Sequence, residues 1–236
     1  MIDSAALRTR LADVRARIER AAGRARRDPS SIRLVAVSKT FPAEYVRAAA
    51  DAGQIDFGEN KVQEALQKIE QTADLPIRWH LVGHLQSNKA KKVGRFDMIH
   101  SIDDAGLVRS VDEAARAAGR RIELLVQVDL AREATKHGAP EPALAGIFEA
   151  AKGLQAAAIV GLMLLPPAAD DPDEARPYFR DLRAVRDRLL AHGVDPSMLR
   201  ELSMGMSHDF EVAVEEGSTL VRVGTAIFGG RAYVRP

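Results

Sequence analysis

Short apolar segments alternate with amphipathic segments along most of the chain. The apolar segments predict eight β-strands, at residues 32–38, 55–58, 78–83, 96–102, 122–130, 157–165, 198–205 and 218–226. Most of these strands are continuously apolar, which is typical of a parallel sheet that is buried on both faces. Because the segments between them have helical features, the pattern predicts repeated strand–helix units.

Proline, glycine and capping residues mark the ends of several predicted helices. One helix is expected over 42–53, where Pro42 opens it and Gly53 ends it. A second helix is expected over 59–69, and a basic third helix over 85–93. Asp103 is the predicted N-cap of a helix that ends at Gly119.

Eight strand–helix units favour a single closed (β/α)8 barrel of the TIM type, for which about 250 residues is usual. An open, doubly wound sheet is the alternative. The chain has 236 residues and shows no linker, low-complexity tract or internal repeat, so we expect residues 1–236 to form one domain. Apolar residues at helical spacing predict an amphipathic helix over 3–27, packed on the outside of the barrel.

Composition argues against several classes of function. The net charge is +1, which gives no reason to expect a nucleic acid or membrane partner. No apolar run approaches the roughly 18 residues that cross a bilayer. The absence of cysteine excludes disulfides and thiolate chemistry and fits a cytoplasmic protein. His80 and His84 are four residues apart, but no third ligand accompanies them, so no metal site is predicted.

The active site of such a barrel lies at the carboxyl ends of its strands. The polar residues that follow the predicted strands include Ser38, Lys39, Thr40, Glu59, Asn60, His84, Gln86, Asn88, Asp129 and Lys136. Lys39 is notable because it directly follows a buried strand, where desolvation can leave a free amine able to form an imine. The alternative is a lysine whose ammonium group reaches solvent beyond the barrel rim.

The last two strands carry the features of a phosphate site. Barrels often bind phosphate at the loops after strands seven and eight. Ser203 and Ser207 offer hydroxyl groups, and Gly205 allows the backbone to approach an anion just before a helix. Gly224 and Thr225 offer a second backbone donor and hydroxyl. The alternative is a serine cap with ordinary turn glycines.

Arg222 is a cation in the middle of the last strand. A buried arginine needs a partner, which is either a carboxylate or an electron-rich ligand atom. In a purely structural role, Arg222 would form an ion pair with Glu59 or Glu201. If the ligand contains a pyridine ring, a ring nitrogen beside Arg222 would resist protonation. The ring would then be a weaker electron sink.

Six segments resemble one known family, the pyridoxal 5′-phosphate (PLP) homeostasis proteins, also called the YggS/PROSC family. They are LVAVSKTFP (34–42), DFGENKVQEA (56–65), WHLVGHLQSNKAKKV (79–93), VQVDL with EATKHG (126–138), GLMLLP (161–166) and LSMGMSHDFEVAVEEGSTLVRVGTAIFGGR (202–231). They occur in the expected order and span nearly the whole chain.

The resemblance implies a barrel like the N-terminal domain of alanine racemase, with PLP held as a Schiff base on Lys39. It implies that Asn60 faces the cofactor and that Arg222 lies near the pyridine nitrogen. The cofactor-binding residues expected are Lys39, Asn60, Ser203, Gly205, Met206, Ser207, Arg222, Gly224 and Thr225. No catalytic residue is assigned, and the roles of His84, Asp129 and Lys136 stay open.

Three functions are compatible with these residues. A carrier or buffer in vitamin B6 homeostasis is preferred, because an enzyme would need a placed proton donor and acceptor besides the cofactor. No tyrosine directly follows a predicted strand, and no second domain that could supply one is expected after the barrel. Such a protein is expected to be a monomer that binds PLP and passes it to acceptor apoenzymes. A low-activity amino-acid racemase is the second possibility, with Lys39 as one base. A class I aldolase, without PLP, is the third.

Overall fold

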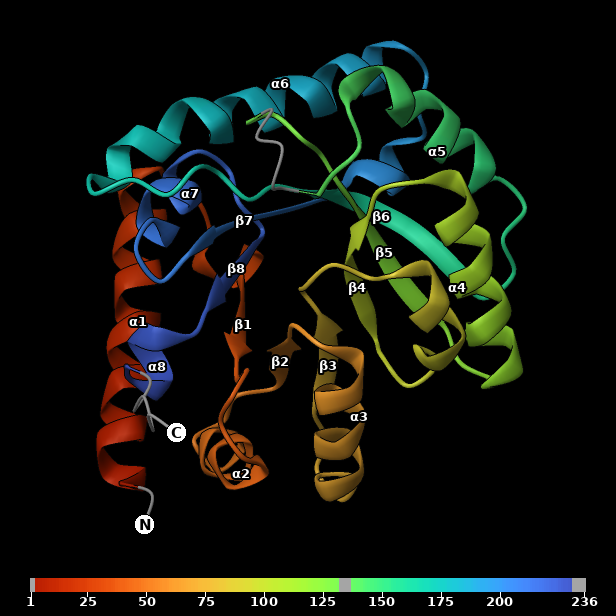
Figure 1. The fold of residues 1–236 in the computed structure, drawn as a ribbon. Helices are drawn as coiled ribbons and strands as arrows, with labels where there is room; N and C mark the ends of the chain where they lie inside the picture. Colours follow the sequence, from red (N-terminus) through yellow and green to blue (C-terminus); the bar gives the residue numbers. More distant parts are fainter. Residues whose placement is uncertain (1–2, 132–136, 231–236) are drawn as a thin grey trace.

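Eight parallel strands form one closed barrel in chain order, in a computed structural model that describes residues 3–131 and 137–230 (Figure 1). The strands are β1 (Arg33–Val37), β2 (Asp56–Glu59), β3 (Arg78–Leu81), β4 (Met98–Ile102), β5 (Ile122–Gln127), β6 (Ala157–Met163), β7 (Glu201–Met206) and β8 (Leu220–Val223). The barrel closes where Val35 of β1 pairs with Arg222 of β8. The predicted (β/α)8 barrel is therefore confirmed, and the open sheet is excluded.

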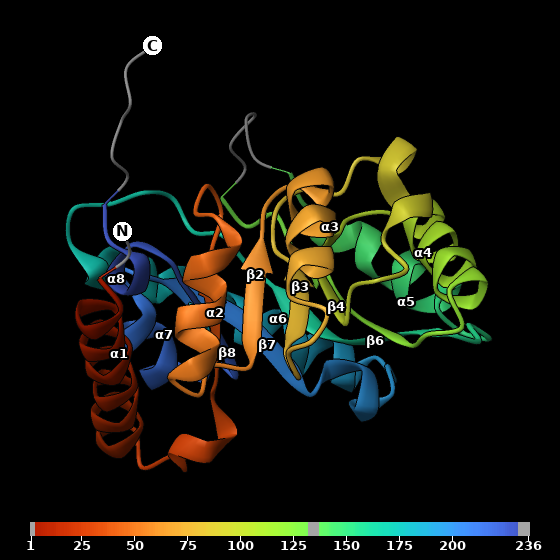
Figure 2. The same ribbon diagram turned by 90° about the horizontal axis from the view of Figure 1, so that it is seen from below.

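Helices surround the strands on the outside of the barrel (Figure 1). They are α1 (Ser4–Arg24), α2 (Ala43–Asp51), α3 (Val62–Gln71), α4 (Ala105–Ala117), α5 (Leu144–Ala150), α6 (Arg176–Ala191), α7 (Phe210–Glu215) and α8 (Thr225–Phe228). Helix α1 lies beside α7 and α8 in both views (Figures 1 and 2). Its residues Leu7, Leu11, Val14 and Ile18 are buried, as expected for the apolar face of an amphipathic helix.

Several element boundaries differ from the predicted ones. Helix α4 is capped by Asp104, whose side chain accepts hydrogen bonds from the backbone of Gly106 and Leu107. The predicted cap at Asp103 is wrong, because that side chain lies beside His84. The basic segment over 85–93 forms only a 3-10 helix at Ser87–Lys92, in place of the expected α-helix.

Buried side chains of the described strands fill the inside of the barrel. Alternate residues of each strand point inward, which separates the interior from the layer between strands and helices. The apolar residues of the interior cluster are Val35, Val37, Val82, Met98, Leu125, Val160, Met163 and Leu220. Gly58 makes room among them, because an added Cβ would lie 3.1–3.3 Å from three valine methyl groups. A second group inside the barrel is polar and includes His80, His100 and Arg222.

Candidate functional site

A pocket of about 640 Å³ lies at the carboxyl ends of the strands. Seven of the predicted binding residues line it, namely Lys39, Asn60, Met206, Ser207, Arg222, Gly224 and Thr225. They come from β1, β2, β7 and β8 or from the loops that follow these strands. The remaining walls are largely apolar and include Val37, Val82 and Leu165. An apolar pocket with a few convergent polar groups is typical of a cofactor or small-molecule site.

Lys39 is half-buried at the pocket, and both of its neighbours in the chain are held by hydrogen bonds. On one side, the Ser38 hydroxyl donates to Glu59 Oε1 at 2.7 Å, and the Ser38 carbonyl accepts from Lys68 Nζ at 2.9 Å. On the other side, Thr40 N donates to Glu64 Oε1 at 2.7 Å. Thr40 has a φ of 71°, a left-handed conformation that a β-branched residue rarely adopts. The chain therefore turns sharply at Lys39 and is anchored before and after it.

The anchor is a buried cluster of charges centred on Lys68. Its ammonium group lies 2.6 Å from Glu59 Oε1 and 2.9 Å from Glu64 Oε1. Burial raises the pKa of Glu59, although hydrogen bonds from Lys68 and Ser38 oppose the shift. Glu59 Oε2 is also buried and has no hydrogen-bond partner among the described residues. Glu59 is thus part of the support of Lys39 and does not line the pocket.

Arg222 is 4% exposed and reaches the pocket from inside the barrel. Its Nη1 donates to Ser203 Oγ at 2.5 Å and its Nη2 donates to the Leu164 carbonyl at 2.8 Å. Burial lowers the pKa of Arg222 to about 10, against the attraction of Asp209, so the group stays charged at neutral pH. The suggested ion pairs with Glu59 or Glu201 are wrong, because those carboxylates bind Lys68 and Arg33.

The loops after β7 and β8 meet at Ser207. Its hydroxyl oxygen lies 3.1 Å from the backbone nitrogen of Gly224 and 3.4 Å from that of Ala226, and accepts hydrogen bonds from both. Two backbone N–H groups are therefore directed at one oxygen atom on the wall of the pocket, which Thr225 also lines. This donor set suits the oxygen atoms of a phosphate group.

Two predicted site residues, Ser203 and Gly205, are not among the residues that line the pocket. Ser203 is fully buried, and its hydroxyl lies between Arg222 and His100 Nδ1, 2.9 Å from the latter. Gly205 has a φ of +94°, and an added Cβ would lie 2.5 Å from the Cβ of Ala213. Glycine is therefore required there for the packing of β7 on α7.

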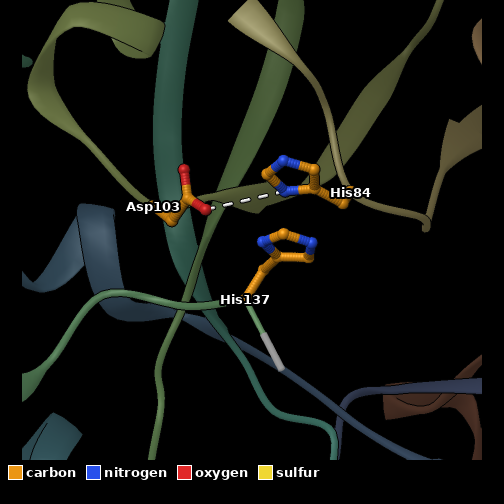
Figure 3. A group of neighbouring side chains, drawn as sticks. All are labelled: His84, Asp103 and His137. Carbon is orange, nitrogen blue, oxygen red and sulfur yellow. Dashed lines mark ion pairs between the residues drawn. The ribbon is translucent and has the colours of Figure 1, made fainter. Parts of the chain in front are cut away.

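The wall near β3 and β4 carries two histidines and an aspartate (Figure 3). The rings of His84 and His137 are stacked, with centroids 3.6 Å apart and planes 9° from parallel. His84 Nδ1 lies 3.6 Å from Asp103 Oδ2. Burial lowers the pKa of His84 and raises that of Asp103. His137 and Gln127 line the pocket but were not predicted to do so.

These three residues present one ligand atom each within a sphere of a few ångströms, as a metal site would. The imidazole planes are nearly parallel, however, so their in-plane lone pairs run side by side and do not converge on one point. As arranged, the group is a polar wall of the pocket. His80 does not join it, because its ring points into the barrel toward His100.

Other polar residues singled out in the sequence lie elsewhere. Asp129 lines a separate hollow with Arg188, and Lys136 lies outside the described residues. Tyr45 packs against Phe41 on the outer side of the barrel, with ring centroids 5.0 Å apart. Tyr233 also lies outside the described residues, and no tyrosine of the described part lines the pocket. Among the described helices, none is long and apolar enough to cross a membrane.

The closed barrel and the position of its pocket define the class of protein as an alanine-racemase-like barrel. The family described as "Alanine racemase, N-terminal domain" matches residues 2–232. Within this class, the chain belongs to the family of pyridoxal phosphate homeostasis proteins, as its motifs predicted.

Two relatives and one solved structure support this assignment. The pyridoxal phosphate homeostasis protein of Aquifex aeolicus is 42% identical over 95% of this chain and 98% of that protein. The protein of the same name from Pseudomonas aeruginosa is 42% identical over 96% of each chain. The structure of PipY from Synechococcus elongatus with PLP bound has a TM-score of 0.83 and 40% identity, over 94% of this chain and 100% of that one.

Proposed function

We propose that this protein binds PLP as a Schiff base on Lys39 and takes part in PLP homeostasis in the cytoplasm. One observation carries the proposal: the anchored Lys39 shares a pocket with the amide and hydroxyl donors around Ser207. The PLP-bound structure of PipY and the names of the relatives support the same cofactor.

The donor set fits the chemical groups of PLP. The phosphate suits the amide N–H of Gly224 and the hydroxyls of Ser207 and Thr225, which are neutral donors on residues that line the same pocket. The planar ring suits the apolar walls of the pocket. When bound, PLP supplies an aldehyde that condenses with an amine, and an aromatic ring that can withdraw electrons. Lys39 provides the only lysine amine among the described residues that line the pocket.

Arg222 favours storage of the cofactor over catalysis. As a permanent cation and a donor without acceptor capacity, its guanidinium group cannot accept a proton from a pyridine nitrogen and opposes the protonation of one nearby. A neutral pyridine is a weaker electron sink than a pyridinium ion. No tyrosine of the described part lines the pocket as a second acid or base, although three histidines do, namely His84, His137 and His208. A carrier that delivers PLP to acceptor apoenzymes, acting as a monomer, is therefore the preferred function.

One observation favours the second candidate, a low-activity amino-acid racemase. His84 lines the pocket, and burial lowers its pKa, so the ring is available as a neutral base near pH 7. Deuterium exchange at the α-carbon of alanine tests this candidate. Exchange that exceeds the rate of free PLP and that is lost on His84→Ala would favour the racemase, whereas exchange at the rate of free PLP would favour the carrier.

The proposal is tested by the visible absorbance spectrum of the protein with PLP, before and after reduction with borohydride. We expect a yellow band that bleaches on reduction, with the reduced adduct on the peptide that contains Lys39. Lys39→Ala should lack both, whereas Lys61→Ala should retain both, because Lys61 is exposed and does not line the pocket. An adduct on another lysine, or a protein that stays colourless with PLP, would contradict the proposal. Light scattering during size-exclusion chromatography tests the monomer.

A further inference from the structure

A continuous chain of hydrogen bonds crosses the interior of the barrel, from the pocket to the opposite end. It runs from Arg222 on β8 through Ser203 on β7, His100 on β4 and His80 on β3 to Asp56 on β2. The successive distances between donor and acceptor atoms are 2.5, 2.9, 2.9 and 2.9 Å. Each of the five residues is at most 6% exposed. Only Arg222 lines the pocket.

The two ends of the chain fix the direction of every hydrogen bond within it. Arginine can only donate, so the Ser203 oxygen accepts from Arg222 and its hydroxyl hydrogen is free to donate to His100 Nδ1. His100 then carries its hydrogen on Nε2 and donates to His80 Nδ1. His80 in turn carries its hydrogen on Nε2 and donates to Asp56 Oδ1, which as a carboxylate only accepts.

The reverse order of donors and acceptors would leave one buried hydrogen without an acceptor. If His100 donated from Nδ1, both described partners of the Ser203 hydroxyl would be donors, and its hydrogen would have no acceptor among the described residues. Burial, His80 and the charge of Arg222 also lower the pKa of His100 well below its usual range, which keeps the ring neutral. A buried hydroxyl whose hydrogen has no acceptor destabilises the folded protein.

The charged groups around the chain support the same direction. At the far end, burial raises the pKa of Asp56, but hydrogen bonds from His80 and Arg78 outweigh it and hold the pKa below its ordinary value. Arg78 Nη2 lies 2.8 Å from Asp56 Oδ2, and its side chain reaches solvent. Arg33 adds a second positive charge that acts on His100, and Asp209 acts on Arg222.

We propose that Asp56, His80, His100 and Ser203 are positioning residues, which hold the Arg222 guanidinium in one orientation toward the ligand in the pocket. The guanidinium group offers donors and no acceptor, so it would meet a hydrogen-bond acceptor of the ligand, which in the proposed cofactor is the unprotonated pyridine nitrogen. The identity of the ligand rests on the proposed function, but the chain of hydrogen bonds is present without a ligand. Ser203 and the Leu164 carbonyl take up two of the five N–H donors of Arg222, so the guanidinium group cannot rotate freely.

The first test needs no ligand. Nitrogen-15 spectra of the histidine side chains in the PLP-free protein report which ring nitrogen carries hydrogen, and single His→Gln variants assign the signals. We expect both His80 and His100 to be neutral, with hydrogen on Nε2, at neutral pH. A ring with hydrogen on Nδ1, or a doubly protonated ring, would overturn the proposed chain.

The second test separates positioning from general stability. Asp56→Asn keeps the shape of the side chain but removes the negative charge at the end of the chain of hydrogen bonds. Asp56 does not line the pocket. Ser218→Ala is the matched control, because its buried hydroxyl also lies close to β8 but contacts only the carbonyls of Leu202, Met204 and Leu220. Thermal unfolding verifies that both variants fold.

We expect Asp56→Asn to release PLP about two- to tenfold faster than wild type. It should also shift the pH midpoint of the visible band, whereas Ser218→Ala should match wild type in both. Ser203→Ala, which removes the contact with Arg222 directly, should show the larger change. Equal behaviour of Asp56→Asn and Ser218→Ala would overturn the positioning role. A wild-type protein that takes up no PLP would refute the proposed function instead, and the histidine spectra alone would then decide on the chain.

Discussion

Lys68 Nζ lies 2.6 Å from Glu59 Oε1, and this ion pair ties helix α3 to the end of β2. Both side chains are almost completely buried. Glu59 also accepts from Ser38, and Lys68 also donates to the Ser38 carbonyl, so the pair supports the segment that carries Lys39. A buried pair adds little stability over an apolar replacement, but the loss of one partner leaves the other charge uncompensated.

Lys68→Met should therefore lower the free energy of unfolding by about 3 kcal/mol, because it leaves the Glu59 carboxylate buried with only Ser38 as a donor. Urea denaturation at neutral pH measures the change. Lys61→Met, on the same side of the barrel but exposed, should change it by less than about 0.5 kcal/mol. The double variant Lys68→Met with Glu59→Gln should recover part of the loss. A single variant as stable as Lys61→Met would show that the pair is dispensable.

Acid should weaken the contact between α4 and the start of β6. Asp112 Oδ1 accepts from the backbone nitrogens of Gln155, Ala156 and Ala157 at 2.7–3.0 Å. Burial raises the pKa of Asp112, but these hydrogen bonds outweigh it and hold the pKa below its ordinary value. Because the pKa of Asp112 is lower in the folded state than the unfolded value of about 3.9, the group stabilises the protein at pH values above about 3.9. This contribution is lost as the pH falls through the folded pKa.

Asp112→Asn should consequently cost about 1–3 kcal/mol at neutral pH, and its difference from wild type should shrink as the pH falls below about 4. Urea denaturation over a series of pH values measures this. Glu113→Gln, the exposed neighbour, is the control, and its free energy of unfolding at neutral pH should differ from that of wild type by less than about 0.5 kcal/mol. A constant difference between Asp112→Asn and wild type would mean that the charge of Asp112 does not contribute.

The barrel and part of its site could be predicted because their signals are local. Continuous apolar runs identify parallel strands, and a cation at the end of such a run, like Lys39, or inside one, like Arg222, is conspicuous. Lys68 gave no such signal, because its burial depends on how α3 packs against the end of β2. His137 was missed for a similar reason, since the path of the loop that carries it decides where its ring lies.

The positions of Ser203 and Ser207 show most clearly what could not be predicted from the sequence alone. Ser203 lies near the end of the predicted strand at 198–205 and Ser207 comes just after it, and both were predicted to bind phosphate. The pairing of β7 with β8 shifts in register between Ser203 and Met206, which leaves Ser203 inside the barrel and brings Ser207 to the rim. A register shift depends on contacts between strands that are distant in sequence, so the spacing of the two serines alone could not reveal it.

Gly205 should tolerate no side chain. Gly205→Ala would combine a φ of +94° with a Cβ 2.5 Å from that of Ala213, and should destabilise the protein by about 2–4 kcal/mol. Gly193→Ala is the matched control, because Gly193 has a φ of +86° but nothing within 4 Å of an added Cβ. Its cost should be limited to the backbone strain, about 1 kcal/mol. Thermal or urea denaturation of both variants measures the difference, and equal costs would show that the packing of β7 on α7 yields to the added methyl group.

Ser207→Ala should weaken the binding of the phosphate group and spare the rest of the cofactor. The variant removes the hydroxyl to which the backbone nitrogens of Gly224 and Ala226 are directed. One hydrogen bond to a charged group contributes roughly 1.5 kcal/mol, so the dissociation constant for PLP should rise about tenfold.

Pyridoxal, which has the aldehyde but no phosphate, is the internal control for this variant. Its affinity for wild type and for Ser207→Ala should be the same within about twofold, because a serine that serves only the phosphate contributes nothing to a ligand without one. Spectral titration with the two aldehydes measures both constants on the same protein. An equal loss for PLP and pyridoxal would show that Ser207 shapes the pocket as a whole, and the phosphate would then have to be assigned to other donors.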